Sequence, residues 1–448
     1  MLKKSFWIRS LCVSLALSFS LTLAACDSAS QENPSSGTAG KEQVAENADP
    51  ITLQYSFWGD DYTVQQKIKA AELYTVEHPN VSFEYIYCSG VDYQTKMQTW
   101  FSSGDAPDII STAVDIMVPY LDTGSFEDLS DRVKNDGLEK AWMPELVEFF
   151  THDGKLLSAP NQYVTTVLAY NKDLFDQAGV EYPKDDWTEE EFYNTLESLK
   201  NGLSDPETYA IHMPYAYPLI FYRRLYGDPG MYDLQTMQMT SKDNPRFQKA
   251  FENMARLTID GYMPYTTASR SAVQGGFETG KYALGLITYG NLPTMRDQVA
   301  DSFEWDTVMW PYSEEFETRW TAVVFGNGYG IYTGNEHKDQ AWDVIKFLTT
   351  TPEVCDIDAE FGVPALQTYQ NDSGFMEDYL GCDPFNKQVF VNTLESATIY
   401  YSVGVWAQVN DVAVDQFNQC IEGKIDFDSA IETISQQGQE IFDANRME

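Results

Sequence analysis

The group of this sequence best suited to binding chemistry is Trp58-Gly59-Asp60-Asp61. An alternating, β-rich segment at 51–58 precedes it, so the group should lie in the loop beyond the carboxyl end of a strand. There the indole could stack on the apolar face of a ring, and the carboxylates could accept hydrogen bonds from hydroxyl groups. The structural alternative is that the acidic pair caps the following helix and that Trp58 packs beneath it.

Other polar and aromatic side chains follow predicted strands or lie in a loop held by proline. They are candidate ligand contacts for the same reason: Asp115, Tyr215, Tyr217, Tyr289 and Asn291. Each has a structural alternative, namely a solvated loop acid, a cap on the backbone, or a ring that covers a core. With 28 Tyr, 25 Phe and 10 Trp in the chain, composition does not choose between these interpretations.

Motifs for catalysis and metal binding are missing from the sequence. No Gly-x-Ser-x-Gly, Ser-x-x-Lys or His-Glu-x-x-His occurs, and there are only four histidines. A carboxylate pair for glycoside hydrolysis can always be imagined among 68 acidic residues, so it carries no weight. Asp426-Phe427-Asp428 begins like a calcium loop but lacks the glycine and the later ligands. We therefore expect no enzyme, no metal site and no cofactor.

The glycine-rich stretch Gly326-Asn327-Gly328-Tyr329-Gly330 is a second motif that could mislead. Its spacing fits neither a dinucleotide-binding fingerprint nor a phosphate-binding loop. We predict a hinge or turn there, in which glycine supplies positive φ angles.

The elements that must position these residues alternate between strands and helices. Strands are expected at 51–58, 81–87 and 108–110, with helices at 64–77 and 92–103 between them. This β-α-β-α-β order predicts a parallel sheet with covering helices. Later strands are expected at 159–170, 282–288 and 328–332. Later helices are expected at 187–199, where Thr188 and Glu191 form a capping box, and at 243–260, 341–349, 411–421 and 428–444.

The charge balance limits the partners. The 448 residues, enough for about three units of roughly 150 residues, include 68 acidic and 29 basic ones, for a net charge of −39. Nucleic acid binding needs a basic footprint, which the body of the chain lacks. An anionic membrane surface would repel the protein as well.

The N-terminus supplies a different route to a membrane. Lys3, Lys4 and Arg9 precede a short apolar run at 11–23, and Leu-Ala-Ala-Cys follows at 23–26. The run is too short to span a bilayer and is typical of a signal peptide. The last four residues resemble a bacterial lipobox, so we expect residues 1–25 to be removed and Cys26 to carry the lipid. Residues 26–49 then form a polar tether, since they cannot bury enough apolar surface to fold.

Four cysteines remain in the mature chain, namely Cys88, Cys355, Cys382 and Cys420. Export permits disulfides, and four cysteines allow three pairings that the sequence does not decide. The alternative is that all four are free, small and buried.

Five motifs, in order along 104–342, resemble those of the bacterial extracellular solute-binding proteins of sugar-type ABC transporters. They are Gly-Asp-Ala-Pro-Asp-Ile-Ile at 104–110, Tyr-Asn-Lys-Asp-Leu-Phe at 170–175 with Ala-Gly-Val at 178–180, Trp-Thr-Glu-Glu-Glu-Phe at 187–192, Phe-Glu-Thr-Gly-Lys-Tyr-Ala-Leu at 277–284, and Gly-Tyr-Gly-Ile at 328–331 with Lys-Asp-Gln-Ala-Trp at 338–342. One such motif would be weak evidence, whereas five in order behind a lipobox are specific.

The resemblance implies a two-lobed α/β fold with a hinge and a ligand cleft between the lobes. Lobe 1 would comprise 50–162 and 308–355, and lobe 2 would comprise 163–307 and 356–448. The implied function is the capture of a mono- or oligosaccharide by hinge closure and its delivery to the permease subunits of an importer. The implied protein is a monomer outside the cytoplasm, held at the membrane by its lipid alone.

The resemblance also bears on single residues. Maltose-binding members of the family have an Asp-Arg pair where this chain has Asp115 and Ile116, so one charged hydroxyl contact is lost. Many members have a stacking Trp where this chain has Leu292, and Tyr289 or Asn291 could substitute for it. Trp406 lies near the place of another stacking Trp, although its spacing to Gly423 differs.

The resemblance also makes Asn161, Gln162 and Tyr163 candidates, because they fall at the first implied hinge crossing, where the family commonly places a ligand contact; the alternative is that they cap the hinge backbone. Trp310 is a candidate because it lies near the second crossing.

Two other ligand or function classes stay open beside the carbohydrate interpretation. A glycerol-phosphate or other anionic ligand would need a basic cluster, for which Arg223-Arg224 is the only adjacent pair in the mature body outside helix-surface lysines. A secreted glycoside hydrolase or a surface adhesin is the remaining alternative. Hydrolysis of chromogenic glycosides would separate the enzyme from the binding protein.

Overall fold

The computed structural model describes residues 49–213, 225–227, 230–233, 236–264, 276–320, 323–372, 375, 386–399 and 405–445. Asp49–Glu448 form one compact unit. The predictions for the signal peptide, Cys26, Tyr215, Tyr217, Arg223-Arg224 and Cys382 lie outside the described residues.

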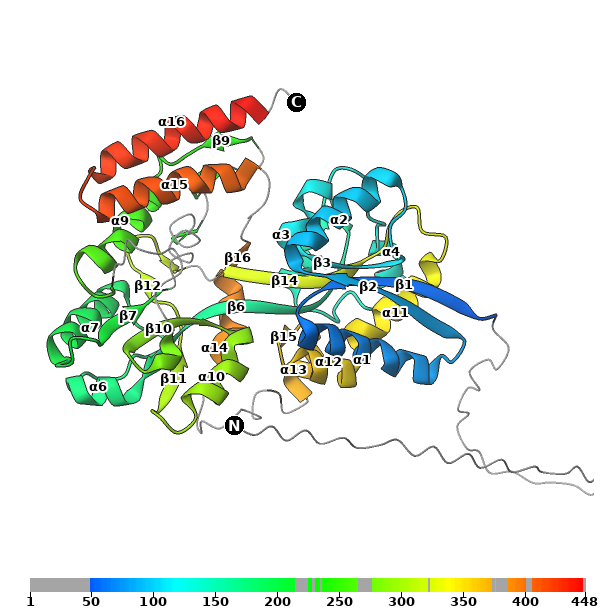
Figure 1. Cartoon of the computed structure of the whole chain (residues 1–448), viewed down its shortest axis with the longest axis horizontal. Helices are drawn as coiled ribbons and strands as arrows, with labels where there is room; N and C mark the ends of the chain where they lie inside the picture. The colour runs from blue at the N-terminus through cyan, green and yellow to red at the C-terminus, as the bar shows by residue number, and fades with distance from the viewer. Residues whose placement is uncertain are drawn as a thin grey trace, which may run out of the picture. The chain divides into compact units, whose positions relative to one another are not determined.

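A ten-stranded sheet organises the described part of the chain (Figure 1). Its main path is β2 (Val81–Cys88), β1 (Ile51–Trp58), β3 (Ile109–Ala113), β14 (Val323–Gly330), β6 (Ala159–Asn171), β10 (Tyr282–Thr288) and β7 (Tyr209–His212). Off this path, β11 (Trp305–Val308) and β15 (Val363–Pro364) pair with β6, and β16 (Thr398–Ile399) pairs with β14. β1 is parallel to both β2 and β3, as the β-α-β-α-β order predicts. β14 and β6 are antiparallel, so the sheet as a whole is mixed.

Strand β6 belongs to both halves of this sheet. Its first half pairs with β14 and β15, with Thr165 opposite Val324 and Tyr163 opposite Val363. Its second half pairs with β10 and β11, with Leu168 opposite both Leu286 and Val308. Figure 1 shows β6 extending from the β1–β3 side of the sheet to the β7 and β10 side. One continuous strand therefore fixes the register of both halves.

Helices cover the sheet, and two-residue strands form three hairpins. The helices are α1 (Asp61–Glu77), α2 (Gly90–Ser103), α3 (Val114–Met117), α4 (Ser130–Asn135), α5 (Pro144–Phe149), α6 (Lys172–Ala178), α7 (Glu189–Gly202), α9 (Pro245–Ile259), α10 (Leu292–Val299), α11 (Lys338–Thr350), α12 (Pro352–Asp358), α13 (Gln367–Asp372), α14 (Gln388–Asn392), α15 (Val405–Ile421) and α16 (Phe427–Asn445). The 3₁₀ turns are η1 (Val118–Tyr120), η2 (Phe277–Thr279), η3 (Tyr289–Asn291) and η4 (Thr393–Ser396). The hairpins are β4 (Thr151–His152) with β5 (Lys155–Leu156), β8 (Tyr232–Asp233) with β9 (Gln238–Met239), and β12 (Tyr312–Ser313) with β13 (Thr318–Arg319).

Capping residues decide where several helices begin. α1 starts three residues before its first predicted residue because Asp60 accepts a hydrogen bond from the Thr63 amide at 2.9 Å. α2 starts early for the same reason, with Ser89 as its cap. The capping box of Thr188 and Glu191 in α7 is confirmed. Side-chain caps satisfy backbone N–H groups that the first turn of a helix leaves unpaired.

The prediction of a turn with positive φ angles at the glycine-rich stretch 326–330 is wrong, whereas its role as a hinge stays a prediction. These residues lie inside strand β14, and none of its three glycines has a positive φ. The glycines are required by close approach instead. A Cβ at Gly328 would lie 2.6 Å from the Ala159 carbonyl oxygen, and one at Gly330 would lie 2.8 Å from the Phe126 ring.

Two clusters of buried side chains stabilise the fold. The first includes Tyr55, Ile110 and Ile345, and the second includes Phe192 and Met254. β6 contributes to both, through Tyr163 in the first cluster and Leu168 in the second. The shared strand thus links the two cores as well as the two sheet halves.

Substitution of Gly328 should reveal the close packing of β14. We expect Gly328→Ala to lower the free energy of unfolding by about 1–3 kcal/mol, because backbone atoms on β6 must move to admit the methyl group. Gly90→Ala is the control, since its Cβ would meet only Trp58 Cδ1 at an ordinary 3.6 Å. Urea unfolding of both variants tests this. Equal stability of Gly328→Ala and the unsubstituted protein would contradict it.

Candidate ligand-binding site

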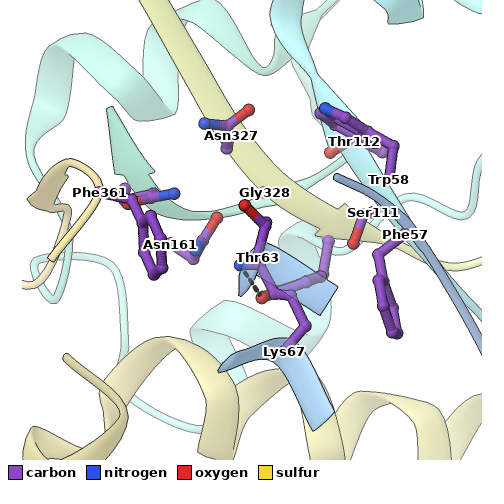
Figure 2. A pocket seen from close by; sticks show the side chains of 12 residues that line it. Phe57, Trp58, Thr63, Lys67, Ser111, Thr112, Asn161, Asn327, Gly328 and Phe361 are labelled. Carbon is purple, nitrogen blue, oxygen red and sulfur yellow. Dashed lines mark hydrogen bonds between the residues drawn. The ribbon is translucent and has the colours of Figure 1, made fainter. Parts of the chain in front are cut away.

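A pocket of about 150 Å³ opens at the carboxyl ends of β1 and β3 (Figure 2). Its walls come from β1, α1, β3, β6, β14 and the turn after α12. The lining residues are Phe57, Trp58, Thr63, Lys67, Ser111, Thr112, Asn161, Gln162, Asn327, Gly328, Tyr329 and Phe361. Ligands of open α/β sheets bind beyond the carboxyl ends of parallel strands, so the location fits a binding site.

Two aromatic rings, those of Trp58 and Phe361, line the pocket from opposite sides (Figure 2). Trp58 ends β1, and its ring lies 5.0 Å from the ring of the fully buried Tyr93. Phe361 contributes a second ring from the turn after α12. The ring of Tyr62, in the first turn of α1, lies 5.5 Å from Phe361, and its hydroxyl donates to Glu360 at 2.5 Å. Contacts across almost 300 residues of sequence therefore hold the turn after α12 against α1.

The other walls present buried polar atoms that lack partners. Within the described residues, Ser111 Oγ, Asn161 Oδ1 and Gln162 Oε1 have no hydrogen-bond partner. Their side chains are buried, with 5%, 2% and 7% of their surface exposed. Buried polar groups are nearly always hydrogen-bonded, and leaving one unpaired costs about 1–3 kcal/mol. All three residues line the same pocket, so their unpartnered atoms are candidates for bonds to a ligand.

A buried ion pair lies at the α1 side of the pocket. Lys67 Nζ lies 3.4 Å from Asp358 Oδ1 and donates to the Tyr329 hydroxyl at 2.9 Å. Asn161 Nδ2 donates to the other carboxylate oxygen of Asp358 at 2.8 Å. Burial raises the pKa of Asp358, whereas the ammonium of Lys67 acts in the opposite direction. The carboxylate therefore depends on its two partners.

Of the predicted ligand contacts, Trp58, Asn161 and Gln162 line this pocket. Asp60 does not line it and caps α1, and its bond to the Thr63 amide lowers the pKa of the carboxyl. Asp61 is exposed in the first turn of α1. Asp115 lies in α3, directly after β3, and its side chain is outside the described part of the chain.

The remaining predicted contacts in the described ranges are not among the lining residues of this pocket. Tyr163 and Trp310 are fully buried, and the Trp310 indole donates to the Thr166 carbonyl at 2.8 Å. Tyr289 donates to the Ala359 carbonyl at 3.1 Å, and Asn291 closes a capping box with Thr288. Trp406 stacks on Tyr232 at 5.0 Å. Their role as ligand contacts stays a prediction, as it does for Tyr215 and Tyr217.

Sequence reasoning missed several residues of the site. Thr63 and Lys67 are one turn apart on α1, so they face the same way, and this spacing could have indicated them. Asn327 and Tyr329 were hidden by the interpretation of their segment as a turn. Asp358 and Phe361 gave no sequence signal, because only the fold brings them to β1 and β6.

The sequence model of the family described as bacterial extracellular solute-binding protein matches residues 58–354, well over half of the chain. The chain belongs to this family. Its members are binding proteins, so the expectation of a non-enzymatic protein is confirmed. The family is extracytoplasmic, and no helix in the described ranges is long and apolar enough to cross a membrane.

This extracellular solute-binding protein is similar in sequence to two sugar-binding proteins over part of its length. It is 31% identical over 127 residues to the lactose-binding protein of Rhizobium radiobacter, covering 27% of this chain and 29% of that protein. It is 34% identical over 120 residues to a diacetylchitobiose-binding protein of Streptomyces coelicolor, covering 27% of each. The chain thus matches less than a third of the length of either relative.

Matches that cover more of the chain are also to substrate-binding proteins. The maltotriose-binding protein of Pyrococcus abyssi is 23% identical over 349 residues, or 76% of this chain and 70% of that protein. Among solved structures, the sugar-binding protein MalE of Xanthomonas citri aligns with a TM-score of 0.76 at 19% identity, over 89% of this chain and 98% of that one. A Listeria monocytogenes ABC substrate-binding protein in complex with cycloalternan aligns with a TM-score of 0.70 at 19% identity, over 88% and 99%. The predicted two-lobed α/β fold is confirmed.

The three cysteines that the structure describes, Cys88, Cys355 and Cys420, are free thiols. Their pairing with one another, which the sequence left open, is therefore not observed.

Single and double substitutions of the ion pair in the pocket should lower the stability of the protein to different extents. Lys67→Met should lower the free energy of unfolding by about 3–5 kcal/mol, because it leaves a buried carboxylate without its cation. The double variant Lys67→Met/Asp358→Asn should lose less, since no charge is stranded. Lys242→Met, which removes the exposed partner of Glu432, should change stability little. Guanidinium unfolding measures all three, and equal losses in the single and double variants would refute the prediction.

Proposed function

We propose that this chain is the substrate-binding lipoprotein of an ABC importer and that it captures a neutral mono- or oligosaccharide for the permease. The observation that carries the proposal is the pocket at the β1 and β3 ends, which combines aromatic rings with buried, unpartnered oxygens. Sugars offer apolar C–H faces to rings and hydroxyl groups to such oxygens. The names of the relatives, which bind lactose, diacetylchitobiose and maltotriose, support the same class.

An anionic ligand such as glycerol phosphate is the weaker candidate. Lys67 is the one cationic side chain among the lining residues, and Asp358 neutralises it. The net charge of −39 also opposes the approach of an anion. A pocket of about 150 Å³ is small beside the roughly 300–1,000 Å³ of typical ligand sites. It therefore suits a single sugar unit, and a longer ligand would need contacts beyond it.

Closure of two lobes is the proposed mechanism of capture. Lobe 1 would comprise 50–162 and 308–355, and lobe 2 would comprise 163–307 and 356–448. The position of β6 supports a crossing near residue 163, because its pairing partners change along its length. A ligand that binds the closed state more tightly would shift the population toward it.

Ligand binding should be visible as thermal stabilisation of the purified full-length protein. At about 100 times Kd, a sugar should add roughly 2.7 kcal/mol to the free energy of unfolding and raise Tm by a few degrees. The panel contains maltose, lactose, diacetylchitobiose, maltotriose and glycerol phosphate. Trp58→Ala should then weaken binding by about 2- to 12-fold, whereas Trp58→Phe keeps a stacking face and should lose less. If glycerol phosphate stabilises the protein and none of the sugars does, the assignment of a carbohydrate ligand is wrong.

The lipid anchor on Cys26 is a further part of the proposal, supported by the lipobox-like Leu-Ala-Ala-Cys at 23–26 and the polar segment after it. A tether of 23 residues spans roughly 25 Å as a random coil, so a monomeric binding unit would stay beside its permease. Cys26→Ser should abolish incorporation of labelled palmitate and move the protein from the detergent phase to the aqueous phase in Triton X-114 partitioning. Cys88→Ser is the control and should stay in the detergent phase. Unchanged partitioning of Cys26→Ser would exclude this anchor.

A further inference from the structure

Asp358 lies beneath the pocket without being one of its lining residues. Its residue surface is 3% exposed, and it ends α12. Both of its oxygens contact residues that do line the pocket: one accepts from Asn161 Nδ2 at 2.8 Å, and the other lies 3.4 Å from Lys67 Nζ. A single buried carboxylate therefore touches two walls of the site.

The bond to Asn161 fixes the direction of that amide. An ionised carboxylate only accepts hydrogen bonds, so the atom of Asn161 that faces Asp358 must be its nitrogen. The carbonyl oxygen is then held on the opposite side, where it has no partner in the described part of the structure. Asn161, a lining residue, is thereby left with an unpartnered acceptor, and it stands beside Gln162, whose Oε1 is also unpartnered.

The contact with Lys67 fixes the charge of the site. Asp358 and Tyr329 occupy two of the three ammonium donors, which leaves one donor for the pocket. Because the carboxylate balances the ammonium, the pocket has donors and acceptors but no net charge among these groups. Figure 2 shows Lys67 and Asn161 among the labelled side chains that surround the pocket.

We propose that Asp358 is a positioning residue that makes the pocket select neutral hydroxylated ligands over their phosphate esters. The inference rests on the proposed function and deepens it. A sugar hydroxyl can donate to Asn161 Oδ1 and accept from Lys67 at the same time. A phosphate dianion has no proton to donate to the Asn161 oxygen, and Asp358 already neutralises Lys67, the one cationic side chain among the lining residues, so its charge would be buried without a free cation to balance it.

The test is the preference of Asp358→Asn for matched ligands. Isothermal titration calorimetry of the full-length protein would use maltose, lactose and glucose, each beside its phosphate ester. Asparagine keeps the shape of aspartate but frees the charge of Lys67 and lets the Asn161 amide turn. We expect the ratio of phosphate-ester affinity to neutral-sugar affinity to rise by about 10-fold or more. Glu353→Gln removes the same charge from the exposed face of α12 and should leave the ratio unchanged.

The outcomes separate the inference from the function on which it rests. A purely structural role of Asp358 would weaken both ligands alike, so an unchanged ratio in Asp358→Asn overturns the inference while leaving the function intact. Binding of phosphate esters but of no neutral sugar by the unsubstituted protein overturns both. If Asp358→Asn does not fold, the double variant Lys67→Met/Asp358→Asn, which strands no charge, replaces it. That variant should bind neutral sugars about 10-fold more weakly with no gain for phosphates, and unchanged sugar affinity would refute the proposal.

Discussion

A strand inside a protein must pair its backbone N–H and C=O groups, and the thirteen residues of β6 meet this demand with different partners on their two halves. The first half depends on β14 and β15, and the second half depends on β10 and β11. Both hydrophobic cores form against this strand. The close approach of β14 at Gly328 follows from it, since any side chain there would collide with the β6 backbone. The same strand also positions part of the pocket, because Asn161 and Gln162 are among its first residues.

The site adds a second constraint, which is electrostatic. A buried carboxylate is costly unless it is paired and hydrogen-bonded, and Asp358 obtains both from residues far away in the sequence. The same contacts that satisfy Asp358 orient Lys67 and Asn161. Stability and recognition are therefore coupled in this pocket, while the rings of Trp58 and Phe361 take no part in the charge network.

Local sequence signals predicted the elements well. The alternation at 51–58, the capping box at Thr188 and the order of the first five elements are all confirmed, because they depend on neighbours along the chain. The glycines of β14 failed as a signal, since glycine serves both positive φ and close packing, and only the neighbouring strand decides which. The same limit applies to the site. Trp58 could be proposed from its position at the end of a strand, and Gln162 from the hinge crossing that the family resemblance implies. Asp358 and Phe361 become neighbours of β1 and β6 only through tertiary contacts.

Those tertiary contacts have a consequence for the timing of function. The pocket draws on Trp58 and Lys67 near the start of the folded unit and on Asp358 and Phe361 some 300 residues later. If the chain folds from its N-terminus, β1, α1 and β2 can form early. Lys67 then has no carboxylate partner until α12 has formed. Contacts of such long sequence separation form slowly. The pocket therefore becomes able to hold a ligand only after α12 has packed against α1 and β6, which is late in the folding of the chain.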